Sequence, residues 1–381
     1  MPVRVVPKLH DGDEELIRKC AKELVFPDAD LRPRRKQRCD VFVRPLGRWG
    51  YTDSRLYRVA FNQEQSRPFV IKTDLRSEMD KEAKGLREAT NLRGTESAKR
   101  YPRRGPCEAI LYPLIAPRGS VEDITELGDV MYAVPRAPRQ LSPVKLLQSL
   151  YDIVALNNAT IPRRINYGRE YRRYLREKSR SRKLLDPLSD FFPEERSMSR
   201  HGGLTLRNPR RILNEVKMRT LDTRVRHVHG DLHPKNVLID DQRNPNMIDF
   251  AYGSASGHWV KDFVLMECSV RFVEPPRLLQ AEPLRYADHA LLREDGTDEM
   301  REIANNSSTR TAEVLNEMAA LVETIRSKCR ECHPGYDFDE YLTAMYLILM
   351  GCIRLAAYQD FRVMLALCDL TNHLEERLVA A

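Results

Sequence analysis

The sequence lacks any uninterrupted apolar run of 18 or more residues, the length that a membrane-spanning helix requires. The opening stretch MPVRVVPKLHDGDEELIRK has no apolar core of the kind that secretory signals carry, so no such signal is expected. The eight cysteines are scattered along the chain, which is typical of free thiols in a reducing compartment. These absences predict a cytoplasmic protein with no membrane segment.

The composition is that of a folded protein with a modest basic excess. Of 381 residues, 42% are hydrophobic and 31% are charged, which favours a globular chain with one large domain or two lobes. Lysine and arginine outnumber the acids by 63 to 55. The excess is concentrated between Arg163 and Lys183, where ten of 21 residues are basic, and such a stretch can attract anionic ligands.

The residue pattern divides the chain into three parts. Residues 1–38 predict a helix followed by a basic linker. Residues 39–138 are rich in short β-prone runs, namely DVFVRPL, SRLYRVAF, RPFVIKTDL, CEAILYPLI and DVMYAVPRA, with one helix at SEMDKEAKGLREATNL. Residues 139–381 are mostly helical and include a basic insert at 163–210. This order indicates an α+β protein.

Within the helical part, PVKLLQSLYDIVALNN has apolar residues at helical spacing. Two long helical stretches are expected at the end of the chain, at residues 309–332 and 338–376. Between these helical regions, NVLID and NMIDF predict a short pair of strands.

The richest cluster of chemical groups surrounds that strand pair, in the sequence HGDLHPKNVLIDDQRNPNMIDF. Asp231 is followed five residues later by Asn236, and Asp249 ends the second strand. Phosphoryl transfer needs a group that orients the attacking hydroxyl and hard oxygen ligands that hold magnesium on the phosphates. Two carboxylates and an amide on one rigid ribbon meet that need, so the stretch predicts a catalytic and metal-binding ribbon rather than a polar turn.

The pattern H-G-D-x-x-x-x-N followed by I-D-F resembles the aminoglycoside phosphotransferase and choline kinase superfamily. The resemblance implies a bilobal, protein-kinase-like fold with a small antiparallel-sheet N-lobe and a mostly helical C-lobe. It implies a catalytic set of Asp231 as base, Asn236, and His229 as a structural member that braces the loop near Asp249. Asn236 and Asp249 would bind magnesium, and Asp262 would tie down the catalytic loop.

The same resemblance assigns residues that hold ATP. Lys72 ends V-I-K on the third predicted strand and would contact the phosphates of ATP. Its ion-pair partner should come from the helix that follows, where Glu78, Glu82 and Glu88 compete. Glu82 is favoured because KEAKGL is similar to the helix motif of the superfamily.

Two further segments complete the expected nucleotide site. Gly50 and Thr52, in GRWGYTDSRLYRV, match a loop that covers phosphates, although Asp53 stands where glycine is common and adds a repelling charge. The backbone around Ala133 and Pro135, in MYAVPRAP, would bind adenine.

The sequence thus predicts an ATP- and magnesium-dependent phosphotransferase acting on a hydroxyl of a small molecule. An alternative is an atypical protein kinase acting on a partner protein, and another is a pseudokinase or RNA-binding regulator. Residues 163–183 could contact an acidic protein or RNA. The order of elements is also similar to kinase-like domains of bacterial conflict and signalling systems.

Overall fold

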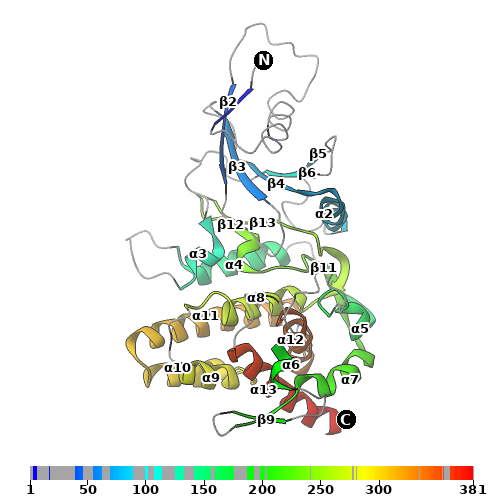
Figure 1. Cartoon of the computed structure of the whole chain (residues 1–381), viewed down its shortest axis with the longest axis vertical. Helices are drawn as coiled ribbons and strands as arrows, with labels where there is room; N and C mark the ends of the chain where they lie inside the picture. The colour runs from blue at the N-terminus through cyan, green and yellow to red at the C-terminus, as the bar shows by residue number, and fades with distance from the viewer. Residues whose placement is uncertain are drawn as a thin grey trace.

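The computed structural model describes most of the second half of the chain and the main elements of the first. The described residues are 3–6, 17, 39–45, 55–61, 69–88, 99–101, 107–113, 125–132, 141–155, 159–175, 187–192, 198–201, 204–240, 242–276, 279, 281–333, 335–353, 355 and 361–380. The β-sheet of the first third lies at one end of the molecule, and the helices of the last third lie at the other (Figure 1). None of the described helices is both long enough and apolar enough to cross a membrane.

The first part of the chain forms a six-stranded sheet with the strand order β1-β2-β3-β4-β6-β5. Its strands are β1 (Val3–Val6), β2 (Cys39–Pro45), β3 (Arg55–Phe61), β4 (Phe69–Leu75), β5 (Lys99–Tyr101) and β6 (Cys107–Pro113). Lys72 lies in the middle of β4 and pairs in register with Leu56 of β3 and Ile110 of β6. It therefore projects from a strand that is held on both sides.

The sheet is antiparallel, as the sequence predicts, except at one edge, where β1 runs parallel to β2. A parallel pair needs a connection of a dozen or more residues, and residues 7–38 supply one. The sequence predicts that residues 1–38 are a separate N-terminal segment, a helix followed by a basic linker. The structure instead adds residues 3–6 to the sheet.

Helix α2 (Arg76–Glu88) follows β4 directly and has a clear inner face. Met79, Glu82, Ala83, Gly85 and Leu86 are buried, whereas the side chains between them face outward. The end of α2 is attached to the helical part of the chain, since His227 Nδ1 lies 2.7 Å from the carbonyl oxygen of Glu88. The helix thus links the sheet to the region below it (Figure 1).

Two small sheets connect the large sheet to the helices. In the first, the predicted strand pair forms as β12 (Val237–Ile239) and β13 (Pro245–Met247), and β7 (Thr125–Glu126) joins it on the β12 side. In the second, β11 (Thr220–Val228) lies between β8 (Ile161–Asn166) and β14 (Ser254–His258). The loop from β11 to β12 contains the H-G-D sequence, so both sheets hold its ends.

The remaining helices enclose one continuous hydrophobic core. They are α3 (Leu127–Val130), α4 (Pro143–Ala155), α5 (Tyr167–Glu170), α6 (Pro187–Phe191), α7 (Leu213–Met218), α8 (Lys261–Phe272), α9 (Ala281–Ala290), α10 (Gly296–Asn305), α11 (Thr309–Cys332), α12 (Phe338–Cys352) and α13 (Phe361–Ala380), with short 3-10 helices at Pro209–Ile212 and Pro234–Asn236. Every residue of α8 is buried, and Phe263 of α8 stacks on Tyr151 of α4 with ring centroids 4.6 Å apart. The chain is a mixed α and β protein, as the sequence predicts.

Two sequence-based expectations differ from the observed elements. The run DVMYAVPRA does not begin as a strand, because Leu127–Val130 forms α3. The single helical stretch expected over residues 338–376 is two helices, α12 and α13. The segment 163–210, predicted as a basic insert, contains α5, α6 and a hairpin of β9 (Met198–His201) and β10 (Leu204–Arg207).

Candidate active site

The loop between β11 and β12 is fixed from below by Asp262, in the first turn of α8. The Asp262 carboxylate accepts hydrogen bonds from the backbone N–H groups of His229 and Gly230, at 2.8 Å each. Asp262 and His229 are fully buried. These two hydrogen bonds hold the backbone just before Asp231 in place. The prediction that Asp262 ties down this loop is confirmed.

His229 connects the loop to the strand end that carries Asp249. Its Nε2 lies 2.8 Å from the carbonyl oxygen of Ile248, which can only accept, so Nε2 carries the proton. Its Nδ1 then accepts from the N–H of Asp231 at 3.3 Å. Burial lowers the pKa of His229, and the ring is neutral. The histidine braces two segments and has no spare proton site.

Asn236 faces Asp231 with a defined orientation. Its Nδ2 donates to the carbonyl oxygen of Asp231 at 2.9 Å. Because that carbonyl can only accept, the amide nitrogen points to it and the amide oxygen points the other way. The backbone carbonyl of Asn236 accepts from the N–H of Ile248 at 3.0 Å. The amide is thereby held at a fixed distance from Asp249.

Lys72 joins the large sheet to this ribbon. Its Nζ lies 2.7 Å from Glu82 Oε2 and 2.7 Å from Asp249 Oδ2. The Lys72 and Glu82 side chains are 5% and 0% exposed, whereas the Asp249 side chain is 29% exposed. Of the three competing acids in α2, Glu78 and Glu88 instead pair with Lys81 and Lys84 on the outer face of the helix.

The surroundings of the two aspartates shift their pKa values in opposite directions. Burial, and then the charge of Asp249, raise the pKa of Asp231 to about 7. Burial alone would raise the pKa of Asp249 too, but Lys72 outweighs it and lowers that pKa. For Lys72, burial is outweighed by the charges of Glu82 and Asp249, which raise its pKa. Asp249 is thus ionised at neutral pH, while Asp231 can exchange a proton near neutral pH.

The backbone around Asp249 is strained and closely packed. Asp249 has a φ of 64°, in the left-handed region that residues with a side chain rarely adopt. The turn after it packs against α2 so closely that a Cβ on Gly85 would lie 1.6 Å from the carbonyl oxygen of Phe250. Gly85 lies three residues after Glu82, on the same face of α2. The packing that holds the turn therefore also positions the partner of Lys72.

His233 lies near Asp231 without a hydrogen bond to it. The distance from His233 Nε2 to Asp231 Oδ2 is 3.9 Å. Burial lowers the pKa of His233 to about 4, so the ring is neutral at physiological pH. His233 therefore brings no positive charge to the carboxylate.

Three residues that the motifs did not reveal also border the loop. The hydroxyl of Tyr174 donates to the carbonyl oxygen of Gly230, next to Asp231. Its ring stacks on Tyr252, with centroids 6.1 Å apart and planes at 24°. Arg173 donates from Nη1 to the carbonyl oxygen of Ala251 at 3.4 Å. In the sequence Arg173 and Tyr174 are only part of an arginine- and tyrosine-rich run, and Tyr252 follows the I-D-F segment without belonging to its motif.

The structure brings together six of the residues that the motifs predicted, from four separate segments. They are Lys72, Glu82, His229, Asp231, Asn236 and Asp249. The other predicted nucleotide contacts, Gly50, Thr52, Ala133 and Pro135, lie outside the described residues, as does Asp53. Within the described part of the chain, no group of three or more His, Cys, Asp or Glu side chains is arranged to hold a metal ion.

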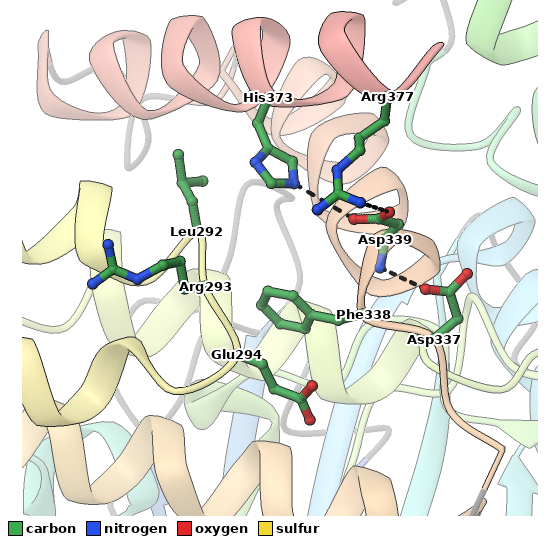
Figure 2. Close-up of a pocket in the computed structure, with 8 residues that line it drawn as sticks. All are labelled: Leu292, Arg293, Glu294, Asp337, Phe338, Asp339, His373 and Arg377. Atoms are coloured by element: carbon green, nitrogen blue, oxygen red, sulfur yellow. Dashed lines mark hydrogen bonds and ion pairs between the residues drawn. The ribbon is translucent and has the colours of Figure 1, made fainter. Parts of the chain in front are cut away.

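A cavity of about 330 Å³ lies away from these residues, between the loop after α9 and the helices α12 and α13 (Figure 2). Its charged lining residues have partners within the lining or beside it: Arg293 pairs with Glu299 and Glu294 pairs with Arg330. Asp339 lies 3.5 Å from both His373 and Arg377, and Asp337 Oδ1 accepts from the N–H of Asp339 at 2.9 Å. None of the residues that line it belongs to the candidate site.

A family model described as ternary complex associated domain 9 matches residues 165–350 of this chain. That range contains the H-G-D loop and Asp249 but not Lys72 or Glu82. No curated protein sequence is similar enough to count as a match.

Among solved structures, the chain is similar to three phosphate-transferring enzymes, by their names. A thermostable mutant of aminoglycoside phosphotransferase APH(4)-Ia in its apo form has a TM-score of 0.42 and 10% identity, covering 89% of this chain and 95% of that one. Glucosamine kinase has a TM-score of 0.41 and 15% sequence identity, covering 96% of this chain and 85% of that one. The choline kinase LicA from Streptococcus pneumoniae has a TM-score of 0.38 and 10% sequence identity, covering 95% of this chain and 100% of that one. Aminoglycoside phosphotransferase and choline kinase are also the names of the superfamily that the motifs of this chain resemble.

Proposed function

We propose that this chain transfers the γ-phosphoryl group of ATP, with magnesium, to a hydroxyl group of a small molecule. The observation that carries the proposal is the position of Lys72, 2.7 Å from both Glu82 and Asp249. A buried ion pair between a strand and a helix, joined to a carboxylate beside a second aspartate, gives the parts that phosphoryl transfer needs. These parts come from distant segments of the chain and meet at one point.

The residues present fit a magnesium ion. Magnesium prefers hard oxygen ligands and usually takes one or two protein ligands, with phosphate and water completing the shell. Asp249 supplies a carboxylate that stays ionised, and the orientation of Asn236 leaves its amide oxygen for a further partner. Asn236 and Asp249 would therefore hold the ion. When bound, magnesium would neutralise charge on the phosphates.

Lys72 would direct the phosphates of ATP toward this pair. Its ammonium group remains charged because Glu82 and Asp249 raise its pKa. Glu82, which is fully buried, fixes the direction of the side chain. A charged ammonium held by a buried partner can donate to phosphate oxygens without first being reoriented, which is the advantage of a preorganised site.

Asp231 would accept the proton of the attacking hydroxyl. In the transfer, a bond forms between the hydroxyl oxygen and the γ-phosphorus, and the bond from that phosphorus to the bridging oxygen of ADP breaks. ADP leaves with the electron pair, and the hydroxyl proton moves to Asp231 Oδ. Asp231 has the required access, since its side chain is 32% exposed while the loop backbone beneath it is fixed by Asp262.

The test compares Asp231→Asn and Asp249→Asn with the wild-type chain. Asp249→Asn should abolish the magnesium-dependent part of ATP binding in calorimetry. Asp231→Asn should bind ATP with magnesium normally but lose phosphoryl transfer. Asp222→Asn is the matched control, because that side chain is 80% exposed on β11 and only weakly paired with Arg164. Full transfer by either of the first two variants would contradict the proposal.

The acceptor class is read from labelled products. Wild-type protein, labelled ATP and a cell extract are incubated, and the label is followed into small molecules and into protein bands separately. Label in small molecules supports the proposal. Label in protein bands alone would instead indicate a protein kinase, and no ATP binding at all would indicate a pseudokinase.

A further inference from the structure

The surface beside Asp231 is formed by two tyrosine rings. Tyr174 is joined to the catalytic loop through its hydrogen bond to the Gly230 carbonyl. Tyr252, three residues after Asp249, stacks on Tyr174 and is 39% exposed, which makes it one of the few large apolar side chains at the described surface. Both residues contact Gly230, the residue before Asp231: a Cβ on Gly230 would lie 2.3 Å from the Tyr252 carbonyl oxygen and 3.1 Å from its Cβ, and Tyr174 donates to the Gly230 carbonyl oxygen. An exposed ring therefore stands where an acceptor would lie.

A positive charge lies against the same ring. The guanidinium carbon of Arg173 is 5.7 Å from the centroid of Tyr252, and its one described hydrogen bond goes to a neutral carbonyl group. No carboxylate among the described residues forms an ion pair with Arg173, nor with the exposed Arg169 and Arg172 of the same segment. These three arginines keep a positive charge that the described protein does not balance.

Several arginines elsewhere in the described structure have acidic partners, although the exposed Arg87, Arg163 and Arg243 form no described ion pair. In α10 and α11, Arg301 pairs with Asp298 and Glu323, Arg310 with Glu313, and Arg330 with Glu294. What distinguishes Arg169, Arg172 and Arg173 is that they lie together in one short segment, α5 and the turn after it, and that Arg173 lies against Tyr252. Guanidinium groups bind phosphate through two parallel hydrogen bonds, and aromatic rings accept planar groups by stacking.

We propose that the acceptor is a hydroxyl compound that already carries a phosphate group and a planar ring, as a nucleotide does. Its ring would stack on Tyr252, and its phosphate would bind Arg173. This inference rests on the phosphotransfer function proposed above. The reaction is then the transfer already written: the acceptor hydroxyl forms the new bond to phosphorus, its proton goes to Asp231, and ADP leaves.

The charge of the acceptor distinguishes this proposal from the obvious alternatives. A cationic hydroxyl compound would be repelled by Arg173. A neutral hydroxyl compound would gain no binding energy from the charge of Arg173. An anionic acceptor would otherwise be repelled by Asp231 and by the phosphates of ATP, and the unbalanced arginines offset that repulsion. Free mononucleotides and the ends of RNA chains share the required chemistry.

The experiment measures binding with the ATP site filled by ADP and magnesium. The probes are cytidine 5′-monophosphate, cytidine, choline, and a single-stranded RNA of six nucleotides, each titrated by calorimetry. The variants are Arg173→Gln, Tyr252→Leu and Tyr252→Phe. Arg164→Gln is the matched control, since Arg164 is an exposed arginine on β8 that pairs with Asp222. Thermal melts check that each variant is folded.

Wild-type protein should bind the monophosphate about 10-fold or more tightly than cytidine. Arg173→Gln should lose most of this preference for the monophosphate over cytidine, and Arg164→Gln should keep it. Tyr252→Leu should lower the affinity for the monophosphate and for cytidine alike by about 5-fold or more. Tyr252→Phe should bind both compounds as tightly as the wild type does. Binding of the RNA but not the monophosphate would assign the chemistry to a nucleic-acid end.

The inference is overturned if neither phosphate-bearing probe binds more tightly than cytidine, or if choline binds best. It is also overturned if Arg173→Gln leaves the ratio of the affinities for the monophosphate and cytidine unchanged. These outcomes are separate from failure of the phosphotransfer proposal, which is read from magnesium-dependent ATP binding by wild-type and Asp249→Asn proteins without any acceptor.

Discussion

Gly85 of α2 and Gly253, in the turn after Asp249, meet backbone to backbone. A Cβ on Gly253 would lie 2.6 Å from the Gly85 carbonyl oxygen, and a Cβ on Gly85 would lie 1.6 Å from the Phe250 carbonyl oxygen. Only residues without a side chain allow this approach. The contact matters because Glu82 and Asp249, the two partners of Lys72, lie on either side of it.

Gly85→Ala should therefore disrupt the nucleotide site without removing any charged group. The added methyl would force α2 and the turn apart, and overpacking of this kind costs about 1–3 kcal/mol in the free energy of unfolding. Because the shift moves Glu82 away from Asp249, ATP–magnesium affinity should fall by about 10-fold or more. Denaturant unfolding and calorimetry measure the two effects.

Lys84→Ala is the control for this prediction. Lys84 lies one residue earlier in α2, but its side chain is 62% exposed. Its removal should change the free energy of unfolding by less than about 0.5 kcal/mol and leave ATP binding unchanged. Equal ATP affinity in Gly85→Ala and Lys84→Ala would show that the contact does not position the site.

A second prediction separates stability from catalysis at Lys72. Lys72→Met removes the nearest cation of a fully buried glutamate, so the free energy of unfolding should fall by about 3–5 kcal/mol. The double variant Lys72→Met/Glu82→Gln should regain most of that loss, because the fully buried glutamate charge is removed together with its partner. Neither variant should transfer phosphoryl groups. Activity in the stable double variant would mean that Lys72 does not bind phosphate.

How far the sequence predicted this site depends on how local each signal is. Asp231, Asn236 and Asp249 are connected by one short hairpin, so their spacing in the chain largely determines their spacing in space. Lys72 and Glu82 could be placed because a central strand and an amphipathic helix follow each other directly. Short-range patterns therefore suffice for most of the candidate site.

The residues that the sequence did not reveal are held by long-range contacts. Tyr174 is 56 positions from Gly230, and nothing in its arginine-rich surroundings distinguishes it from Tyr167 or Tyr171. The strand expected over DVMYAVPRA failed for another reason. A short apolar run looks the same in a buried strand and a buried helix, and Leu127 and Met131 are buried in the helical part of the core. The adenine role expected of Ala133 and Pro135 stays a prediction, because both residues lie outside the described residues.

A third prediction concerns the carboxylate beneath the catalytic loop. Asp262→Asn replaces one acceptor oxygen by an NH₂ group that faces a backbone N–H group. The loss of a buried charge-assisted hydrogen bond should cost about 2–4 kcal/mol in the free energy of unfolding. The loop before Asp231 should also lose its fixed position, so kcat should fall while KM for ATP changes little.

Asp295→Asn is the matched control for that change, because the Asp295 side chain is 87% exposed. It should leave both the free energy of unfolding and kcat unchanged. A rise in KM for ATP with constant kcat in Asp262→Asn would indicate that Asp262 supports the nucleotide site and not the catalytic loop.

The last prediction is a pH dependence of stability that comes from Glu126, in β7 beside β12. Burial, and then the charge of Asp129, raise the pKa of Glu126 to about 7 from an ordinary value of 4.5. The folded chain therefore binds a proton more tightly than the unfolded chain does, and stability is lost as the pH rises from about 4.5 to about 7. Glu126→Gln removes the charge that causes this loss. The variant should match the wild type at pH 4.5 and exceed it by on the order of 1 kcal/mol at pH 8, in denaturant unfolding measured at both values. A stability difference that is the same at both pH values would show that Glu126 is not the group responsible.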